Sequence, residues 1–263
     1  MNFNELLIKA INASISGGYA IMDVYSSDFS VEHKNDKSPL TLADKNCNEV
    51  IEHHLSGTDI PFISEEGKEI TYSERKDWEY YWLIDPLDGT KEFVKRNGEF
   101  TVNIALIHNG NPIIGVIYVP VKEELYFAME GLGSYKISVN SVIENIETLI
   151  SLSDSLPIDY KRVNYVIVGS RSHMSAETEA FFEQKKEEHG NVEIMAVGSS
   201  LKLCMVAEGK ADAYPRYAPT MEWDTGAGHA IAKYAGFSVK QYNSTEDVIY
   251  NKENLLNPWF LVK

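Results

Sequence analysis

Five apolar runs between residues 61 and 130 constrain the fold of this chain more than any other feature. They are PFIS, YYWLI, FTVNIALI, NPIIGVIYVP and ELYFAME. Each run is short and is bounded by polar or turn-forming residues, as is typical of β-strands, and the last two are separated by a gap of hairpin length. The runs therefore predict a meander of antiparallel strands.

Helical patterns precede and follow these runs. Apolar residues recur at helical spacing near the N-terminus, and a second helical pattern starts near Thr41. The segment from Asn140 to Lys161 has few apolar residues and is the best candidate for a boundary. After it, strand and helix patterns alternate, as in layered α/β structures. We predict an α/β (α+β) fold, with residues 1–155 as a first unit and 156–263 as a second.

The composition excludes several classes of partner. Thirty-nine acidic and 24 basic side chains give a net charge of -15, which disfavours polymeric nucleic acid and anionic lipid surfaces. No run approaches the ~20 apolar residues of a membrane span, so we expect a cytoplasmic protein, with loose peripheral association at the inner membrane left open. Cys47 and Cys204 have no CxxC partner and are expected to be buried thiols. A monomer and a homodimer both remain open.

The motif WLIDPLDGTKEF places two aspartates three residues apart after an apolar run. Pro86 disfavours helical geometry at Asp85, so we predict a strand that ends at Ile84, with Asp85 at its tip and Asp88 alongside. Two anions this close would have raised pKa values unless a divalent cation neutralised them, and hard oxygen ligands suit magnesium. The motif thus predicts a magnesium site.

Gly89 and Thr90 complete the same motif. Gly89 permits close approach of the backbone, and the two residues would begin a helical turn whose N–H groups could bind a phosphate. The alternative is an ordinary solvated turn in which Asp88 caps the helix, because Asp, Pro and Gly are common turn formers. Taken alone, the motif is consistent with both a phosphate-binding turn and an ordinary solvated turn.

Further carboxylates could reach the same volume. FISEEG places Glu65 and Glu66 directly after an earlier strand, and EWDTGAG places Asp224 at a predicted helix start. Each has a structural alternative, a charged strand end for the glutamates and a helix cap for Asp224. Asp44 in TLAD fits a capping box with Thr41, so a structural role for Asp44 is at least as well supported as a catalytic one.

Taken together, FISEEG, WLIDPLDGT and EWDTGAG resemble the three signatures of the lithium-sensitive, magnesium-dependent phosphomonoesterases typified by inositol monophosphatase, and the similarity covers nearly the whole chain. Within that superfamily, KSPLTLAD, PLDGTKEFVKRNGEFTVNIALI and GSSLKLCMVAEGKADAYPR resemble the CysQ-type 3′(2′),5′-bisphosphate nucleotidases. The run KEFVKRNGEFTVNIAL is the most discriminating, because inositol phosphatases usually continue differently after DGT. The resemblance implies a layered αβαβα sandwich and hydrolysis of adenosine 3′,5′-bisphosphate to AMP and phosphate.

The resemblance also implies roles for individual residues. The magnesium ligands would be the side chains of four residues and the backbone carbonyl of Leu87, with up to three ions in the full site: Glu65, Asp85, Leu87, Asp88 and Asp224. Asp44 and Thr90 match the pair that positions and deprotonates the attacking water. The implied mechanism is direct in-line hydrolysis without a phosphoenzyme.

Ten positions match substrate-binding residues of the family: Glu65, Leu87, Asp88, Gly89, Thr90, Ser170, His173, Ser199, Lys202 and Asp224. Arg216 is a candidate phosphate partner. The alternative for GSSLK is a turn whose serines cap the following helix, and the alternative for His173 is a loop histidine without a partner.

The sequence is consistent with three alternative functions. The nucleotidase would clear a by-product of sulfate activation, with activity on 3′-phosphoadenylyl sulfate also considered. An inositol or sugar phosphatase could use the same metal ligands, but the KEFVKRNGEF segment argues against it. A metal-dependent nucleotide-binding protein without catalysis would not need the water-activating pair Asp44 and Thr90.

Overall fold

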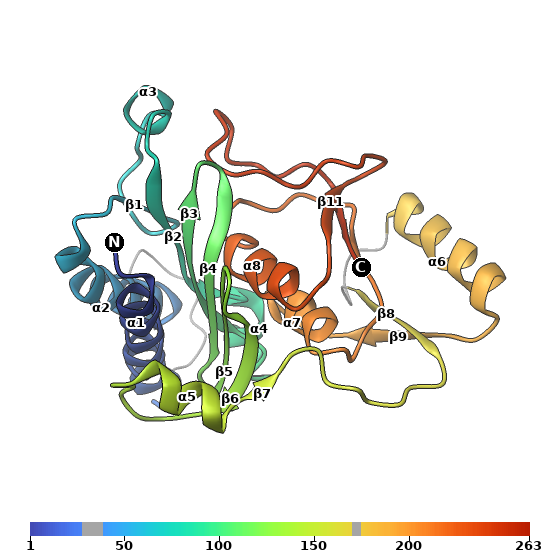
Figure 1. Ribbon diagram of the computed structural model, residues 1–263, viewed down its shortest axis with the longest axis horizontal. Coiled ribbons are helices and arrows are strands. Elements are labelled where there is room, and N and C mark those ends of the chain that lie inside the picture. The colour runs from blue at the N-terminus through green and yellow to red at the C-terminus, as the bar shows by residue number, and fades with distance from the viewer. Residues whose placement is uncertain (28–38, 170–174) are drawn as a thin grey trace.

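The computed structural model describes residues 1–27, 39–169 and 175–263, which fold into stacked layers (Figure 1). Helices α1 (Phe3–Tyr25) and α2 (Pro39–Leu55) cover one face of a seven-stranded sheet. Helices α7 (Leu201–Ala207) and α8 (Gly226–Tyr234) cover the other face. Two smaller sheets follow, and α6 (Ala176–His189) lies outermost. The predicted layered αβαβα arrangement is confirmed.

The strands of the large sheet follow one another in chain order. They are β1 (Phe62–Ser64), β2 (Tyr80–Asp88), β3 (Thr101–His108), β4 (Asn111–Val119), β5 (Glu124–Met129), β6 (Gly133–Ser138) and β7 (Asp154–Ser155). The predicted antiparallel meander is confirmed from β2 to β5. It is wrong for β1, which pairs parallel to β2 with Phe62 opposite Trp82. Residues 65–79 form a long connection that returns the chain to the same end of the sheet, as a parallel pair requires.

Both faces of this sheet are buried, which explains why its strands are continuously apolar. Trp82 and Ile84 of β2 pack with residues of α1 and α2. Their neighbours Tyr81 and Leu83 pack with residues of α7 and α8 on the opposite face. Successive side chains of a strand point to opposite faces, so a sheet covered on both sides needs apolar residues at every position.

Helix α8 lies directly on β4. A Cβ atom added at Gly115 of β4 would be 2.3 Å from the carbonyl oxygen of Ala227 and 2.7 Å from Cβ of Ala230. Only glycine leaves room for this contact, because real Cβ atoms do not approach other atoms so closely. The sheet thereby fixes the start of α8, and with it the preceding Asp224.

The remaining elements complete the outer layers. The smaller sheets contain β10 (Tyr214–Arg216), β12 (Phe260–Val262) and β11 (Val239–Gln241), and the parallel pair β8 (Tyr165–Gly169) and β9 (Val192–Ala196). The short helices are η1 (Ser56–Thr58), α3 (Tyr72–Arg75), α4 (Thr90–Val94) and α5 (Ile146–Leu152). The predicted alternation of strand and helix after residue 161 is therefore confirmed. The division into two units at residue 155 stays a prediction.

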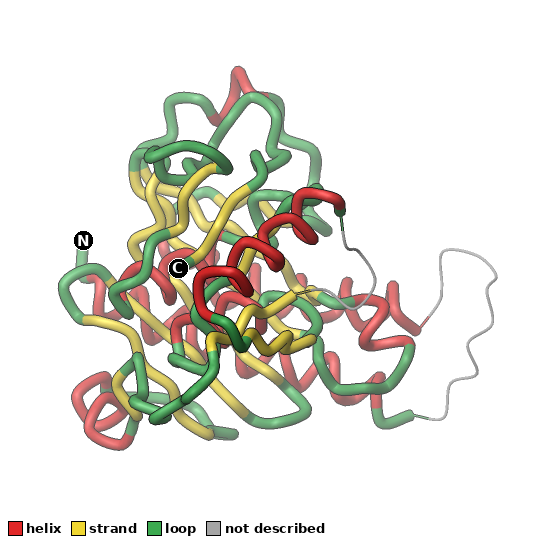
Figure 2. Tube along the Cα trace, turned by 90° about the vertical axis from the view of Figure 1, so that its right-hand side faces the viewer, coloured by secondary structure: helices red, strands yellow, loops and turns green. Residues whose placement is uncertain are grey.

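Helix α6 forms the outer surface, in front of the strands when the molecule is viewed from that side (Figure 2). It begins after Ser175, whose hydroxyl accepts a hydrogen bond from the N–H of Thr178 at 3.2 Å. Cys47 and Cys204 are free and buried, as expected. Within the described ranges, no helix is long and apolar enough to cross a membrane.

Candidate active site

A β-bulge in β2 presents the two aspartates of the DPLDGT motif. The strand does not end at Ile84, as the sequence had predicted, but continues to Asp88. Asp85 lies opposite Asn103 and Asp88 lies opposite Thr101, so the register shifts between the two aspartates. Pro86 has no N–H to donate to the ladder, which favours an irregularity at this point. The bulge, rather than a strand end, turns both carboxylates to one side.

Three carboxylates from distant segments converge beside this bulge. One carboxylate oxygen each of Glu65, Asp85 and Asp224 lies within 4.8 Å of the others. Glu65 directly follows β1, and its N–H donates to the carbonyl of Ile84 at 3.2 Å. Asp85 is 1% exposed, and its Oδ1 accepts from the N–H of Leu87 at 3.1 Å. The structure therefore brings together three of the side chains predicted to bind magnesium.

The pKa values of these three carboxyl groups are raised because the groups are buried close together. Burial, and then the neighbouring Asp88, raise the pKa of Asp85 well above its ordinary value. The same two causes raise the pKa of Asp224 to about 7 and raise that of Glu65. A cluster of this kind needs either protons or a cation, and a set of oxygen donors alone fits a hard divalent cation such as Mg²⁺.

Asp44 lies next to this cluster, within α2. The capping-box alternative for Asp44 is wrong, because α2 begins at Pro39 and both Thr41 and Asp44 lie inside the helix. Asp44 is 7% exposed, and its Oδ1 is buried with no hydrogen-bond partner among the described residues. Burial, and then the charges of Glu66 and Glu65, raise the pKa of Asp44 to about 8. A buried oxygen without a partner is unusual for a purely structural residue.

Gly89 and Thr90 begin α4, as predicted. The φ angle of Gly89 is 98°, in the left-handed region that favours glycine. A Cβ atom here would also lie 3.2 Å from the carbonyl oxygen of Glu99 and from Cβ of Ser199. Glycine therefore brings the loop after β2 close to the turn that precedes α7.

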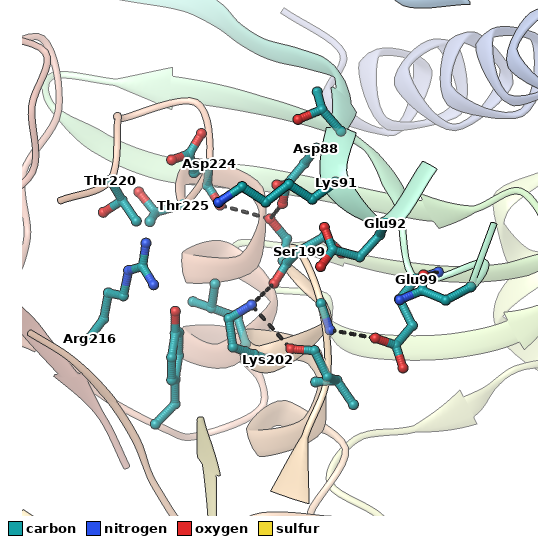
Figure 3. A pocket seen from close by; sticks show the side chains of 18 of the residues that line it. Asp88, Lys91, Glu92, Glu99, Ser199, Lys202, Arg216, Thr220, Asp224 and Thr225 are labelled. Carbon is teal, nitrogen blue, oxygen red and sulfur yellow. Dashed lines mark hydrogen bonds between the residues drawn. The ribbon is translucent and has the colours of Figure 1, made fainter. Parts of the chain in front are cut away.

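A cavity of about 430 Å³ opens beside these segments (Figure 3). Six of the predicted site residues line it: Asp88, Gly89, Thr90, Ser199, Lys202 and Asp224. Leu87 is buried between the two aspartates, and the metal contact of its carbonyl stays a prediction. Ser170 and His173 lie outside the described residues.

The cavity also has a cationic side. Lys202 is 8% exposed, and its Nζ donates to the carbonyl oxygens of Ser199 at 2.7 Å and Val197 at 3.4 Å. Burial lowers the pKa of Lys202 to about 8. Arg216 lines the same cavity and donates to the carbonyl of Pro219 at 2.9 Å. Figure 3 shows both cations facing the cavity that Asp88 and Asp224 also line.

The capping alternative for GSSLK is wrong. Ser200 is the N-cap residue of α7, but its side chain makes no capping hydrogen bond. The Oγ of Ser199 is buried without a hydrogen-bond partner in the described part of the chain, and Ser199 has a φ of 46°. The turn is therefore not explained by helix capping, and it carries Lys202 into the cavity.

Two residues beside the carboxylates, Ser200 and Asn103, were not predicted from the sequence. The Oγ of Ser200 donates to Oδ2 of Asp88 at 2.6 Å, and Nδ2 of Asn103 lies 2.9 Å from the same Oγ. A signal for Asn103 was present, since it is a polar residue within the apolar run FTVNIALI. Ser200 gave no such signal, because serine is common in turns.

A sequence model of the inositol monophosphatase family matches residues 3–259. The chain belongs to the inositol monophosphatase family. Structures of family members share its fold. One is an inositol monophosphatase from Anabaena, which is 25% identical in sequence and matches with a TM-score of 0.71. The match covers 100% of this chain and 92% of that one.

Other members of the family are much more similar. A 3′(2′),5′-bisphosphate nucleotidase CysQ of Shigella flexneri is 43% identical over 261 residues, covering 98% of this chain and 99% of the relative. The crystal structure of CysQ from Bacteroides thetaiotaomicron, described as a bacterial member of the family, matches at 51% identity with a TM-score of 0.95, covering 99% and 97% of the two chains. The resemblance found in the sequence is therefore confirmed.

Proposed function

We propose that this protein is a magnesium-dependent 3′(2′),5′-bisphosphate nucleotidase that hydrolyses adenosine 3′,5′-bisphosphate to AMP and phosphate. Activity on 3′-phosphoadenylyl sulfate, and a role in clearing a by-product of sulfate activation, belong to the same proposal. The observation that carries it is one cavity in which the carboxylates of Asp88 and Asp224 share the wall with two cations, Lys202 and Arg216. The name of the similar relatives supports the choice of substrate. A cytoplasmic location and the choice between monomer and homodimer stay predictions.

The chain's own residues would divide the chemistry between them. Mg²⁺ would be held by the clustered carboxylates of Glu65, Asp85 and Asp224. Asp88 and the carbonyl of Leu87 would be further ligands, as the resemblance to the family implies. Bound Mg²⁺ would lower the pKa of a water and stabilise charge on the departing oxygen. Asp44 would accept the proton of the attacking water, which Thr90 would help to orient. A cation near Asp44 would bring its raised pKa back towards the ordinary range and so provide the ionised base.

The cationic side of the cavity favours a nucleotide bisphosphate over an inositol monophosphate. Two donor positions of Lys202 are used by backbone carbonyls, which leaves its third N–H for a ligand. Arg216 brings a second positive charge into the same cavity. A substrate with two phosphates could place one at the metal site and the other near these cations. A monophosphate would occupy only the metal site.

Substitution of Lys202 tests this assignment. We expect Lys202→Met to raise the KM for adenosine 3′,5′-bisphosphate by about 10- to 100-fold, because a hydrogen bond to a charged group contributes about 1.5–3 kcal/mol. The change for inositol 1-phosphate should be much smaller. Steady-state phosphate release with both substrates measures the difference. Lys161→Met, at a side chain that is 86% exposed, is the control and should change neither KM. Equal losses on both substrates would contradict a role in recognising the nucleotide.

The raised pKa values predict how stability depends on pH without metal. The pKa of Asp44 is raised to about 8 and that of Asp224 to about 7. Aspartates in the unfolded chain titrate near 4, so above that pH the folded state binds more protons and its stability falls as pH rises towards 8. We expect the Tm in EDTA to fall by roughly 5 °C between about pH 6.5 and 8, and Mg²⁺ to remove this fall.

An Asp44 variant is the control for this dependence of Tm on pH. Asp44→Asn removes one of the carboxyls whose pKa is raised, so the fall in Tm in EDTA should become shallower in this variant. A Tm that rises with pH in EDTA in the wild type would contradict the crowding of ionised carboxylates in this site.

Phosphate release from adenosine 3′,5′-bisphosphate tests the proposed function itself. We expect release that depends on Mg²⁺, stops in EDTA and is inhibited by Li⁺. Release that persists at the same rate in EDTA would overturn the metal-dependent mechanism. Saturable binding of the nucleotide with no release, in the presence of Mg²⁺, would favour the non-catalytic alternative.

A further inference from the structure

Ser200 is a buried serine whose hydroxyl contacts two of the predicted metal-binding segments. It is 2% exposed and lies at the start of α7. Its Oγ is 2.6 Å from Oδ2 of Asp88 and 2.8 Å from the backbone carbonyl oxygen of Asp224. The two aspartates come from β2 and from the segment before α8. One hydroxyl group therefore links carboxylate-bearing segments from the two halves of the chain.

A hydrogen-bond chain from β3 determines where the proton of Ser200 points. Oγ1 of Thr101 donates to Oδ1 of Asn103 at 2.9 Å, which orients the amide. Nδ2 of Asn103 then donates to Oγ of Ser200 at 2.9 Å. Ser200 thus receives a hydrogen bond on its oxygen and keeps its own proton for an acceptor. Of the two acceptors in reach, a carboxylate forms the stronger hydrogen bond, so the proton goes to Asp88.

The chain is buried along its whole length. Thr101 is fully buried and Asn103 is 1% exposed, so water does not compete for these groups. A polar chain in such surroundings is stable only when each of its members is paired, and all three are. The same arrangement fixes the rotamer of Asp88, which lines the cavity. Its Oδ2 accepts a short hydrogen bond from Oγ of Ser200 at 2.6 Å and a longer one from Nδ2 of Asn103 at 3.4 Å.

We propose that Ser200, oriented by Asn103, is a positioning residue for the metal site. By donating to Oδ2 of Asp88 it leaves Oδ1 for a cation. This inference rests on the proposed metal site. Groups that orient metal ligands in this way commonly change metal affinity by about 10- to 100-fold when they are removed.

The test measures binding of Mn²⁺ alone to the purified protein, without substrate, from the electron paramagnetic resonance signal of the free ion. We expect Ser200→Ala to raise the Kd for Mn²⁺ about tenfold. Ser134→Ala is a matched control, because Ser134 is a buried serine whose hydroxyl has no hydrogen-bond partner in the described part of the protein. It should leave the Kd unchanged. Thermal unfolding of each variant in EDTA reports on damage to the fold.

A double-mutant cycle separates positioning from general damage. If Asn103 acts through Ser200, Asn103→Ala should weaken Mn²⁺ binding on its own but add little in the Ser200→Ala background. Thr101→Val, at the far end of the chain, should give a smaller effect and serves if Ser200→Ala does not fold. Wild-type affinity in Ser200→Ala, an equal loss in Ser134→Ala, or fully additive losses would each overturn the proposal. A wild type without saturable Mn²⁺ binding would instead overturn the metal site itself.

Discussion

Replacing Asp85 by asparagine is expected to lower kcat for adenosine 3′,5′-bisphosphate by about a thousandfold, which corresponds to about 4 kcal/mol of lost transition-state stabilisation. Asp85 is the most buried of the three clustered carboxylates, and it is the last residue of β2 before the bulge. Asparagine has the same shape, and its amide oxygen can still accept from the N–H of Leu87. The change therefore removes charge from the metal site with little change in packing. Single-turnover phosphate release at saturating Mg²⁺ measures the loss.

Stability distinguishes loss of charge from loss of fold in this variant. Asp85→Asn replaces a carboxyl whose ionisation is opposed by burial and by the neighbouring carboxylates, so its Tm in EDTA should equal or exceed that of the wild type. Stabilisation by added Mg²⁺ should shrink. Asp159→Asn, at a surface side chain that is 76% exposed, should leave both activity and Tm unchanged. Full activity in Asp85→Asn would contradict the assignment of the metal site.

The second large effect is expected for Asp44→Asn. Removing a general base costs about 10²- to 10⁴-fold in rate, so kcat should fall by that amount. Unlike Asp85, Asp44 lies outside the closest group of three carboxylates, so binding of Mn²⁺ should change much less than catalysis does. Mn²⁺ titration and phosphate release on the same preparation make the comparison.

The pH dependence supplies the decisive control for Asp44. In the wild type with Mg²⁺ bound, the rate should rise with pH as the carboxyl ionises, and the variant should lose this rise. If Asp44→Asn loses Mn²⁺ binding in parallel with activity, Asp44 belongs with the metal ligands instead. If the variant keeps its full rate, another group accepts the proton.

Local sequence signals were sufficient for the strands β2 to β5 and for most of the carboxylates, whereas the order of the layers was implied by the resemblance to a family. The apolar runs predicted these strands, and they are continuously apolar because both faces of the sheet are covered, on one side by α1 and α2 and on the other by α7 and α8. Glu65, Asp85 and Asp224 were found because each follows or precedes a strong strand or helix pattern. Their convergence within 4.8 Å depends on the order of elements, which the resemblance to a family supplied.

Features that depend on contacts between distant residues were not predictable. The hydrogen bond between Ser200 and Asp88 joins positions 112 residues apart, and that between Asn103 and Ser200 joins positions 97 apart. The parallel pairing of β1 depends on the path of a long connection rather than on any residue within the strand. The capping box at Thr41 was a local match that failed because α2 begins two residues earlier, at Pro39. Helix ends are set by the surrounding fold as well as by the local sequence.

The substrate preference of the cavity is measured by comparing kcat/KM for adenosine 3′,5′-bisphosphate and for inositol 1-phosphate, with one preparation at the same Mg²⁺ concentration. We expect a large preference for the nucleotide, and we expect Lys202→Met to reduce this preference by about 10- to 100-fold. Equal values for the two substrates, or a preference for the inositol ester, would leave the carboxylate cluster as a metal site but contradict the assignment of the cationic side of the cavity to a second phosphate.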